Sequence, residues 1–343
     1  MKKFIPRFDF PDYNIPRTDF KGHQLKALKK FDSLRPQLNL ILELRDVRAP
    51  LSTRNVLIDQ LIDPRIHQRL VIYTKRDLVA DNTHYLLKLS HWQQEIDEDF
   101  ILIDAKRRQS ARHVLDIIKS YKRQLEVRSQ GLALPTGYKV LVAGMPNVGK
   151  STLINTLRGA GSKVARTGAE AGVTRSTSET IRIGEPHDNI YLIDTPGIGL
   201  PGRLVNERQR MLSLSLCGCV KTNLVDPVVQ ADYLLYLANL QEPHKHYPGA
   251  PTNDVYKLLR RVQPRGAPRD NATAAAVHWL RQSHRGLIYD RELLLDTDSF
   301  SLRGYLSRQP QPEPQAKQQS RVTAHDRRLQ NVHQLFPKLS GTQ

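Results

Sequence analysis

The feature that most constrains the fold is the segment Gly144–Ser151, which reads GMPNVGKS and fits the pattern GxxxxGK[ST]. It follows an apolar stretch, Tyr138–Ala143, that predicts a strand, and it precedes a predicted helix from about Gly149. In such a loop the backbone N–H groups point at phosphate oxygens. We therefore predict that Lys150 reaches the β- and γ-phosphates of a nucleotide, and that the Ser151 hydroxyl ligates Mg²⁺.

The rest of the loop and the first helical turn complete the predicted phosphate site. Its remaining members are Asn147, Val148, Gly149 and Thr152. A glycine turn that matches the pattern by accident is the alternative, and the flanking strand and helix argue against it.

Apolar runs elsewhere predict an α/β fold. Strands are expected at Leu38–Leu44, Leu70–Thr74, Phe100–Ile103, Glu179–Ile183 and Ile190–Ile193, with helices near Thr53–Leu61, Tyr85–Glu95 and Ala111–Leu125. Strands that alternate with helices favour a mostly parallel sheet covered on both faces. After Pro201 the pattern becomes helical, at Leu204–Leu240, Asp254–Val262 and Ala272–Ser283, with a proline-bearing loop at Gln241–Asn253.

Two further motifs suit a nucleoside triphosphate. Asp194-Thr195-Pro196-Gly197 ends the last predicted strand. We expect Asp194 to hold the Mg²⁺ shell through water and the Gly197 N–H to meet the γ-phosphate. Between this motif and the phosphate loop, Thr174 lies in Gly172–Arg175, where a threonine completes the metal shell when triphosphate is bound. Lys150, Thr174 and Gly197 are the predicted catalytic residues.

The base-specificity motif lies upstream of the phosphate loop. Thr74-Lys75-Arg76-Asp77 follows the strand Leu70–Thr74 and matches [NT]KxD. Asp77 can accept two hydrogen bonds from the guanine N1–H and amino group, a donor pair that adenine lacks. The stem of Lys75 can cover one face of the base. The next strand ends in Asp104-Ala105-Lys106, where the Ala105 N–H is placed to donate to guanine O6.

Because the guanine motifs precede the phosphate motifs, the chain resembles the circularly permuted GTPases of the YlqF/RbgA group, and most closely their mitochondrial ribosome-assembly branch. The resemblance covers roughly residues 17–300. Asp46-Val47-Arg48-Ala49-Pro50 is similar to that group's DARxP motif, and the basic segment Lys21-Gly22-His23 precedes it. Two positions depart from the group: Thr74 stands where asparagine is more usual, and Asp104 where serine is usual.

The resemblance implies a P-loop GTPase fold in permuted order with a smaller C-terminal α-helical domain. It implies GTP or GDP and Mg²⁺ as ligands, and late assembly of the mitochondrial large ribosomal subunit as the task, with hydrolysis stimulated by ribosomal particles. The expected location is the matrix, with peripheral contact with the inner membrane left open. The alternatives are a GTP-binding RNA scaffold with little catalysis, and a cytosolic or nucleolar ribosome-assembly GTPase.

Hydrolysis by the isolated protein is expected to be slow. The position after Asp194-Thr195-Pro196-Gly197 often holds a glutamine that orients the attacking water, and here it is Ile198. Asn147 matches an asparagine that helps to bind an activating K⁺ in related GTPases. The alternative is that Asn147 only shapes the loop.

Composition bears on partners. The formal net charge of +18 favours a polyanion, with RNA the leading candidate. The candidate RNA contacts are Lys21, Lys26, Lys29, Lys30, Arg260, Arg261, Arg265, Arg269 and Arg285. Each taken singly is more often a solvated charge. Trp279 and Tyr233 are expected in the core, and Cys217 and Cys219 as reduced thiols. No apolar run is long enough to span a bilayer.

These observations predict four regions. They are a basic N-terminal arm with a short helix at His23–Phe31 (1–35), a permuted GTPase domain (36–200), a helical domain (201–303) and a mostly disordered basic tail (304–343). A monomer is expected. GTP is expected to order the link Ile198–Arg203 and so fix the helical domain relative to the GTPase domain.

Overall fold

The computed structural model describes residues 4–16, 28–29, 31–129, 134, 136–158, 180–200, 208–264, 271–282, 284–295 and 299–309. The residues described here all belong to one compact unit, Met1–Pro310. Thr174, the tail beyond Gln309 and most of the predicted helix His23–Phe31 lie outside the described residues. The division of Met1–Pro310 into a GTPase domain and a helical domain stays a prediction.

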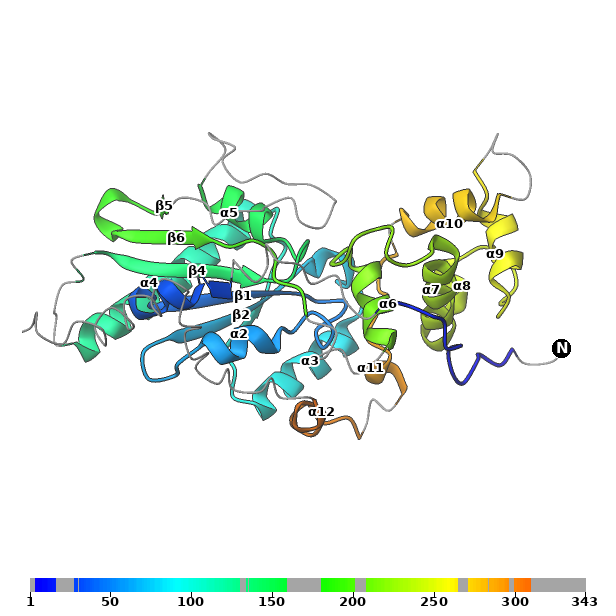
Figure 1. Ribbon diagram of the computed structural model, residues 1–343, viewed down its shortest axis with the longest axis horizontal. Helices are drawn as coiled ribbons and strands as arrows, with labels where there is room; N and C mark the ends of the chain where they lie inside the picture. The colour runs from blue at the N-terminus through cyan, green and yellow to red at the C-terminus, as the bar shows by residue number, and fades with distance from the viewer. Residues whose placement is uncertain are drawn as a thin grey trace, which may run out of the picture. The chain divides into compact units, whose positions relative to one another are not determined.

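The centre of the unit is a six-stranded sheet in the order β3-β2-β1-β4-β6-β5 (Figure 1). The strands are β1 (Leu40–Asp46), β2 (Gln68–Thr74), β3 (Phe100–Leu102), β4 (Tyr138–Gly144), β5 (Ile181–Ile183) and β6 (Ile190–Asp194). All neighbouring pairs are parallel except β5 with β6. The short 3-10 turn Pro186–Asp188 joins those two strands, and so short a connection requires an antiparallel pair. The predicted mostly parallel sheet is confirmed.

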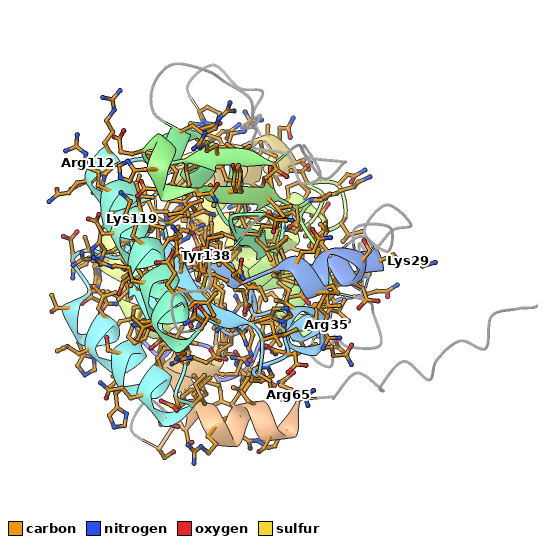
Figure 2. All side chains as sticks on the ribbon, turned by 90° about the vertical axis from the view of Figure 1, so that its left-hand side faces the viewer. Lys29, Arg35, Arg65, Arg112, Lys119 and Tyr138 are labelled. Atoms are coloured by element: carbon orange, nitrogen blue, oxygen red, sulfur yellow. The ribbon has the colours of Figure 1, made fainter. Side chains whose placement is uncertain are left out.

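Helices cover both faces of the sheet, because the central strands carry apolar side chains on both sides. One face packs against α4 (Arg108–Arg128) and α5 (Lys150–Arg158), and Leu42 and Val140 of the sheet are buried in the same core cluster as Val114 of α4. The other face packs against α2 (Val56–Leu61) and α3 (Thr83–Glu95). The basic residues Arg112 and Lys119 lie on the outer side of α4 (Figure 2).

The order of the strands in the chain explains the permutation. β4, which carries the phosphate loop, lies in the middle of the sheet between β1 and β6. β1, β2 and β3 lie on one side of β4 and precede it in the chain. In a parallel sheet the carboxyl ends of neighbouring strands meet at one edge, which is where ligands bind. The loops after β1, β2, β3, β4 and β6 therefore converge there.

The chain continues as helices α6 (Arg208–Leu216), α7 (Pro227–Gln241), α8 (Pro243–His246), α9 (Val255–Val262), α10 (Ala272–Leu280), α11 (Glu292–Leu295) and α12 (Leu302–Arg308). Tyr233 and Trp279 are fully buried, as predicted, and Cys217 and Cys219 are free and buried. None of the described helices has both the length and the apolar character that crossing a bilayer requires.

Two details of this helical part correct the predictions. The loop expected at Gln241–Asn253 contains α8, which proline starts at its first position. Residues Gly304–Arg308, assigned to the tail, belong to α12, because Leu302 and Tyr305 are buried beside Trp92 of α3. The sequence pattern of so short a helix is too brief to be recognised on its own.

The N-terminal segment Arg7–Ile15 is anchored to α7. Phe10 is 6% exposed, with its ring edge-to-face on Tyr233 at 5.0 Å between centroids. Arg7 forms a 2.7 Å ion pair with Asp232, and the Tyr13 hydroxyl donates to the same carboxylate at 3.1 Å. This part of the predicted N-terminal arm has neither helix nor strand, and it is packed into the fold.

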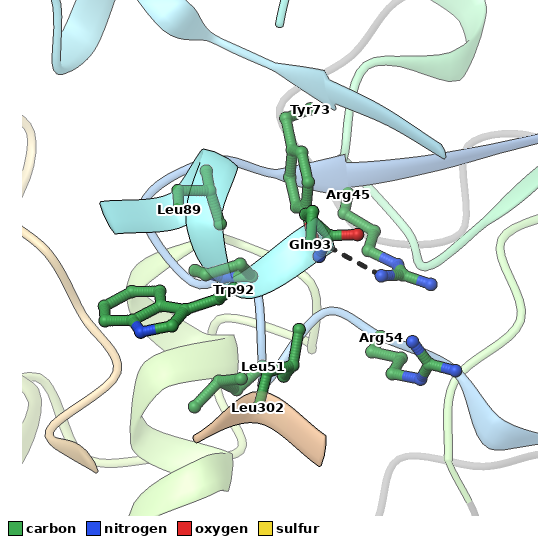
Figure 3. Close-up of a pocket in the computed structure, with 9 residues that line it drawn as sticks. Arg45, Leu51, Arg54, Tyr73, Leu89, Trp92, Gln93 and Leu302 are labelled. Atoms are coloured by element: carbon green, nitrogen blue, oxygen red, sulfur yellow. Dashed lines mark hydrogen bonds between the residues drawn. The ribbon is translucent and has the colours of Figure 1, made fainter. Parts of the chain in front are cut away.

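A cluster of charges is buried between β1 and β2. Glu43 and Arg45 are 0% and 1% exposed and pair at 2.8 Å. A small cavity of about 10 Å³ beside Arg45 is lined by Tyr73, Gln93 and Trp92, and the Gln93 amide donates to the Tyr73 hydroxyl at 2.6 Å (Figure 3). The bond from Gln93 to Tyr73 ties α3 to β2.

Candidate nucleotide site

The phosphate loop has a backbone that only glycine suits at its start. Gly144 has φ = 146°, and a Cβ there would lie 2.5 Å from the Leu44 carbonyl oxygen of β1. Asn147 takes the left-handed φ of 56°, and α5 begins at Lys150, directly after Gly149. The loop therefore wraps closely over β1 and leads straight into a helix N-terminus, which is the geometry that binds phosphate.

Lys150 is buried at the centre of this loop. Its ammonium donates to the carbonyl oxygens of Met145 and Gly144 at 2.7 and 3.2 Å. Burial lowers its pKa to about 8, against the opposing effect of Asp194. A desolvated ammonium gains most from an anionic partner, and a phosphate supplies one.

Asp194 and Gly197 approach the same loop from β6. Burial raises the pKa of Asp194 to about 6, although Lys150 and the Thr195 N–H lower it. Its Oδ1 is buried and has no hydrogen-bond partner among the described residues. Gly197 lies against Pro146, whose Cα would be 2.6 Å from a Cβ at that position. Glycine is therefore required where this segment crosses the phosphate loop.

The loop after β2 is joined to the phosphate loop by a hydrogen bond. The buried Thr74 hydroxyl donates to the Val148 carbonyl oxygen at 2.6 Å and lies 3.1 Å from the Arg45 carbonyl oxygen. Lys75 takes the left-handed conformation with φ = 61°, and its ammonium pairs with Asp46 at 2.6 Å. Asp77 follows in a short 3-10 turn and is partly exposed.

The loop after β3 packs against the same elements. The Arg76 N–H donates to the Ile103 carbonyl oxygen at 3.1 Å, which holds the two loops together. The Asp104 carboxylate accepts from the Lys106 N–H at 3.0 Å. The Thr156 hydroxyl of α5 donates to the Ala105 carbonyl oxygen at 2.9 Å. The predicted guanine and phosphate residues thus lie at one edge of the sheet.

The segment Asp46–Pro50 links this site to the helical part of the chain. Asp46 is 0% exposed and accepts from Arg48 at 2.7 Å and from Lys75 at 2.6 Å, and these cations keep its pKa low despite burial. The Arg48 guanidinium lies 4.7 Å from the Tyr289 ring centroid, and the Tyr289 N–H donates to the Arg48 carbonyl oxygen at 2.7 Å. Arg48 therefore faces Tyr289 rather than the phosphate loop.

A second link runs through Asp290, which is fully buried. It accepts from the Leu51 N–H at 2.6 Å and from the Ser52 hydroxyl at 2.5 Å, and burial raises its pKa to about 6. Arg210 of α6 donates to the Ser52 carbonyl oxygen at 3.2 Å. Sequence reasoning missed this contact, because Ser52 and Asp290 are 238 residues apart and neither lies in a recognisable motif.

Two more contacts connect the phosphate loop with its surroundings. The Asn147 amide donates to the Gly218 carbonyl oxygen, just after α6, at 2.8 Å. Ile198 is buried, its N–H donates to the Gly144 carbonyl oxygen at 3.2 Å, and its own carbonyl oxygen accepts from Asn55 at 2.7 Å. The side chain at the usual glutamine position thus belongs to the core.

Of the predicted RNA contacts, Lys29, Arg260, Arg261 and Arg285 are described, and all four are exposed. Arg261 also donates to the Ala250 carbonyl oxygen at 2.6 Å, so part of its role is to hold the loop before α9. Lys21, Lys26, Lys30, Arg265 and Arg269 lie outside the described residues.

A TKxD loop and a GxxxxGKS loop at the ends of β2 and β4, the two strands that flank β1, define a P-loop GTPase domain in circularly permuted order, because the first loop precedes the second in the chain. Residues 139–262 match a family model described as a 50S ribosome-binding GTPase. The chain is 50% identical over 335 residues to Mitochondrial GTPase 1 of Saccharomyces cerevisiae, covering 90% of each chain. It belongs to the mitochondrial GTPase 1 family, and is therefore a mitochondrial guanine-nucleotide-binding GTPase.

Two other mitochondrial GTPases agree with this assignment. Mitochondrial ribosome-associated GTPase 1 of Xenopus tropicalis is 35% identical over 264 residues, which is 74% of this chain and 81% of that protein. Mitochondrial GTPase 1 of Schizosaccharomyces pombe is 32% identical over 281 residues, 75% of this chain and 81% of that protein. The crystal structure of GNP-bound YlqF from T. maritima superposes with a TM-score of 0.44 at 16% identity, over 77% of this chain and 97% of that one.

Proposed function

We propose that this GTPase assists late assembly of the mitochondrial large ribosomal subunit, bound to the subunit or its rRNA, and uses GTP hydrolysis as a conformational switch. The observation that carries the proposal is the hydrogen bond from Thr74 to Val148, because it joins the guanine loop to the phosphate loop in a chain 50% identical to a Mitochondrial GTPase 1. The names of two other matches, which mention ribosome association and 50S binding, support the partner.

The net charge of +18 also supports a ribosomal RNA partner. We place the protein in the matrix as a monomer, with peripheral contact with the matrix face of the inner membrane as a further part of the proposal. The mitochondrial names of the relatives argue against the cytosolic or nucleolar alternative.

Guanine specificity is assigned to the loops after β2 and β3. Asp77 accepts from the guanine N1–H and amino group, and adenine is rejected because it would leave this carboxylate unpaired. The Ala105 N–H donates to guanine O6, and Asp104 and Lys106 fix the loop around it through their 3.0 Å bond. Asp46 holds the Lys75 ammonium, so the lysine stem is positioned to cover the base.

Phosphate binding is assigned to the loop and first turn of α5. Asn147, Val148, Gly149 and Thr152 present backbone N–H groups, and Lys150 turns from its carbonyl partners to the phosphates. Ser151, Thr174 and Asp194 are the proposed Mg²⁺ residues. The buried, unpartnered Oδ1 of Asp194 fits this role, because such an oxygen needs a cation or donor. Bound Mg²⁺ would neutralise phosphate charge.

The switch is assigned to Gly197 and the segment that follows it. The Gly197 N–H binds the γ-phosphate, and loss of that phosphate releases the segment. The link after Ile198 leads to α6, and Gly218, just after α6, already accepts a hydrogen bond from Asn147 of the phosphate loop. Ordering of this link by GTP would couple the helical part to hydrolysis. Asn147 is also the residue proposed to help bind K⁺, and this role competes with its hydrogen bond to the Gly218 carbonyl oxygen.

One observation favours a second function, a GTP-binding RNA scaffold with little catalysis. Ile198 is fully buried where many GTPases have a water-orienting glutamine. Slow turnover by the protein alone fits both functions. Only stimulation by the ribosomal particle separates them.

The test is GTP turnover in K⁺ buffer with and without mitochondrial large ribosomal subunits, with Asp77→Asn as the specificity control. Marked stimulation is expected, and the variant should shift the preference towards xanthosine triphosphate, because its amide donates where the carboxylate accepted. Tight GTP binding with no turnover above background would instead establish the scaffold function.

A further inference from the structure

The loop 51–55, between β1 and α2, is held in place by buried hydrogen bonds, and we call it the clamp loop. The Thr53 side chain is fully buried, and its hydroxyl donates to the Ala49 carbonyl oxygen at 2.6 Å and accepts from the Asp46 N–H at 3.1 Å. The first two residues of the loop bind the buried carboxylate of Asp290. The clamp loop is therefore an anchored part of the fold.

Asn55 ends the clamp loop, and its fully buried side chain makes two hydrogen bonds. Its Oδ1 accepts from the Leu57 N–H at 3.0 Å, which caps the first turn of α2. Its amide donates to the Ile198 carbonyl oxygen at 2.7 Å. The cap fixes the orientation of the side chain, because the amide cannot turn away without losing the bond to the helix. The donor is therefore held on Ile198.

Ile198 is bonded through both of its backbone groups. Its N–H donates to the Gly144 carbonyl oxygen of the phosphate loop at 3.2 Å, and its carbonyl oxygen accepts from Asn55. The residue before it is Gly197, which lies so close to Pro146 that a Cβ would be 2.6 Å from the proline Cα. Because Gly197 and Ile198 share a planar peptide unit, the two bonds restrict where the Gly197 N–H can lie.

We propose that Asn55 is a positioning residue for the γ-phosphate, because its bond to Ile198 holds Gly197 where the Gly197 N–H meets that phosphate. This inference rests on the proposed function, which assigns γ-phosphate recognition to Gly197. It goes further by naming a residue outside the nucleotide motifs through which the protein distinguishes triphosphate from diphosphate. The Asn55 amide acts through the Ile198 backbone and needs no contact with the nucleotide.

The bond matters for only one of the two nucleotides. Without it, the segment with Gly197 occupies the binding position for only part of the time, and the apparent dissociation constant for GTP rises by the inverse of that fraction. GDP has no γ-phosphate, so its affinity does not depend on where Gly197 lies. Loss of the bond should therefore change the ratio of the two affinities, which a general loss of stability does not do.

The experiment measures the affinities of the full-length protein for GDP and for the β,γ-imido analogue of GTP, with Mg²⁺, by isothermal titration calorimetry. The test variant is Asn55→Ser, which keeps a cap for α2 but has a side chain too short to reach Ile198 as well. We expect it to bind the analogue about tenfold more weakly than the wild type, and GDP within about twofold of the wild type.

The matched control is Asn271→Ser, which makes the same change at the start of another helix. Asn271 is exposed and caps α10 by accepting from the Ala274 N–H at 2.9 Å. Both of its nucleotide affinities should stay within about twofold of the wild type, because serine caps a helix nearly as well as asparagine. Thermal unfolding verifies that the variants are folded.

A second test variant, Asn55→Asp, keeps the size of the side chain and the cap. It places a carboxylate oxygen where the amide donated to Ile198, so two acceptors face each other. It should weaken binding of the analogue at least as much as Asn55→Ser does. Unchanged affinity of Asn55→Asp for the analogue would contradict the proposal even if Asn55→Ser did not fold.

A third variant separates this inference from the proposed function. Gly197→Ala displaces the segment directly, because its Cβ has no room beside Pro146. A changed ratio of affinities in Gly197→Ala but not in Asn55→Ser would leave the γ-phosphate with Gly197 and overturn the role of Asn55. An unchanged ratio in both variants would also contradict the switch assigned to Gly197.

Two further results would overturn the proposal. Equal weakening of GDP and of the analogue by Asn55→Ser would show that Asn55 only maintains the fold. Tighter binding of the analogue by this variant would show that the bond to Ile198 holds the segment away from the γ-phosphate. The measurement contains no ribosomal particles, so stimulation of the wild type by large ribosomal subunits remains a separate test of the proposed function.

Discussion

At the scale of single residues, the proposed phosphate site contains two buried charged groups, Asp194 and Lys150, and their burial lowers the stability of the fold. Folding raises the pKa of Asp194 to about 6 and lowers the pKa of Lys150 to about 8. Compared with the unfolded chain, the folded protein therefore disfavours the charged form of each group. Near neutral pH both groups are charged and desolvated. Without nucleotide, the two charges therefore lower the free energy of unfolding of the protein.

Replacing Asp194 should reveal this cost as a pH dependence. Protonation of Asp194 stabilises the fold fully below the unfolded pKa of about 4, and this contribution is lost as pH rises through about 6. Without nucleotide or Mg²⁺, Asp194→Asn should therefore gain stability over the wild type on the order of 2–3 kcal/mol at pH 7 and almost none at pH 4. Urea denaturation at both pH values measures the difference, and a gain independent of pH would contradict the assignment.

At the scale of elements, one hydrogen bond joins the loop after β2 to the loop after β4. The Thr74 Oγ1 bond to the Val148 carbonyl oxygen is 2.6 Å long and fully buried. The proposed base-binding and phosphate-binding residues come from separate segments of the chain, and this bond joins the two segments.

Thr74→Val should weaken GDP and GTP binding by a similar factor, about five- to thirtyfold, since it leaves a buried carbonyl oxygen unpaired at a cost of about 1–2 kcal/mol. Thr74→Ser keeps the hydroxyl and should restore most of the affinity. Isothermal titration with both nucleotides gives the values. Equal affinities of Thr74→Val and the wild type would show that the two loops are positioned by other contacts.

The elements also show what the sequence allows one to predict. Strands β1, β2, β4 and β6 each contain an apolar run and lie in a parallel sheet, and their place was predicted within two residues. The converging loops followed from the parallel order. The pairing of Arg48 with Tyr289 and of Ser52 with Asp290 could not be predicted, because it depends on the path of the helical part more than 200 residues later.

At the scale of the whole unit Met1–Pro310, the N-terminal segment completes the core of the helical part. Phe10 is 6% exposed and contacts Tyr233 and Tyr236, while Phe8, two residues earlier, is 87% exposed. The two phenylalanines differ in burial alone, which makes them a matched pair.

Phe10→Ala should destabilise the protein by about 3–4 kcal/mol, since it removes a buried ring and leaves a cavity. Phe8→Ala should change the free energy of unfolding by less than about 0.5 kcal/mol. Denaturant unfolding of both variants provides the comparison. Similar values for the two would mean that the segment is not held on α7 in solution.

The ion pair between Arg7 and Asp232 spans 225 residues of chain. A polypeptide that emerges from a ribosome or an import pore with its first residues leading has no α7 to receive Phe10 until most of its length has followed. During that interval the segment Arg7–Ile15 is an exposed aromatic stretch, suited to a chaperone. A chain that lacked this segment would have the rings of Tyr233 and Tyr236 without the aromatic side chain of Phe10 that packs on them.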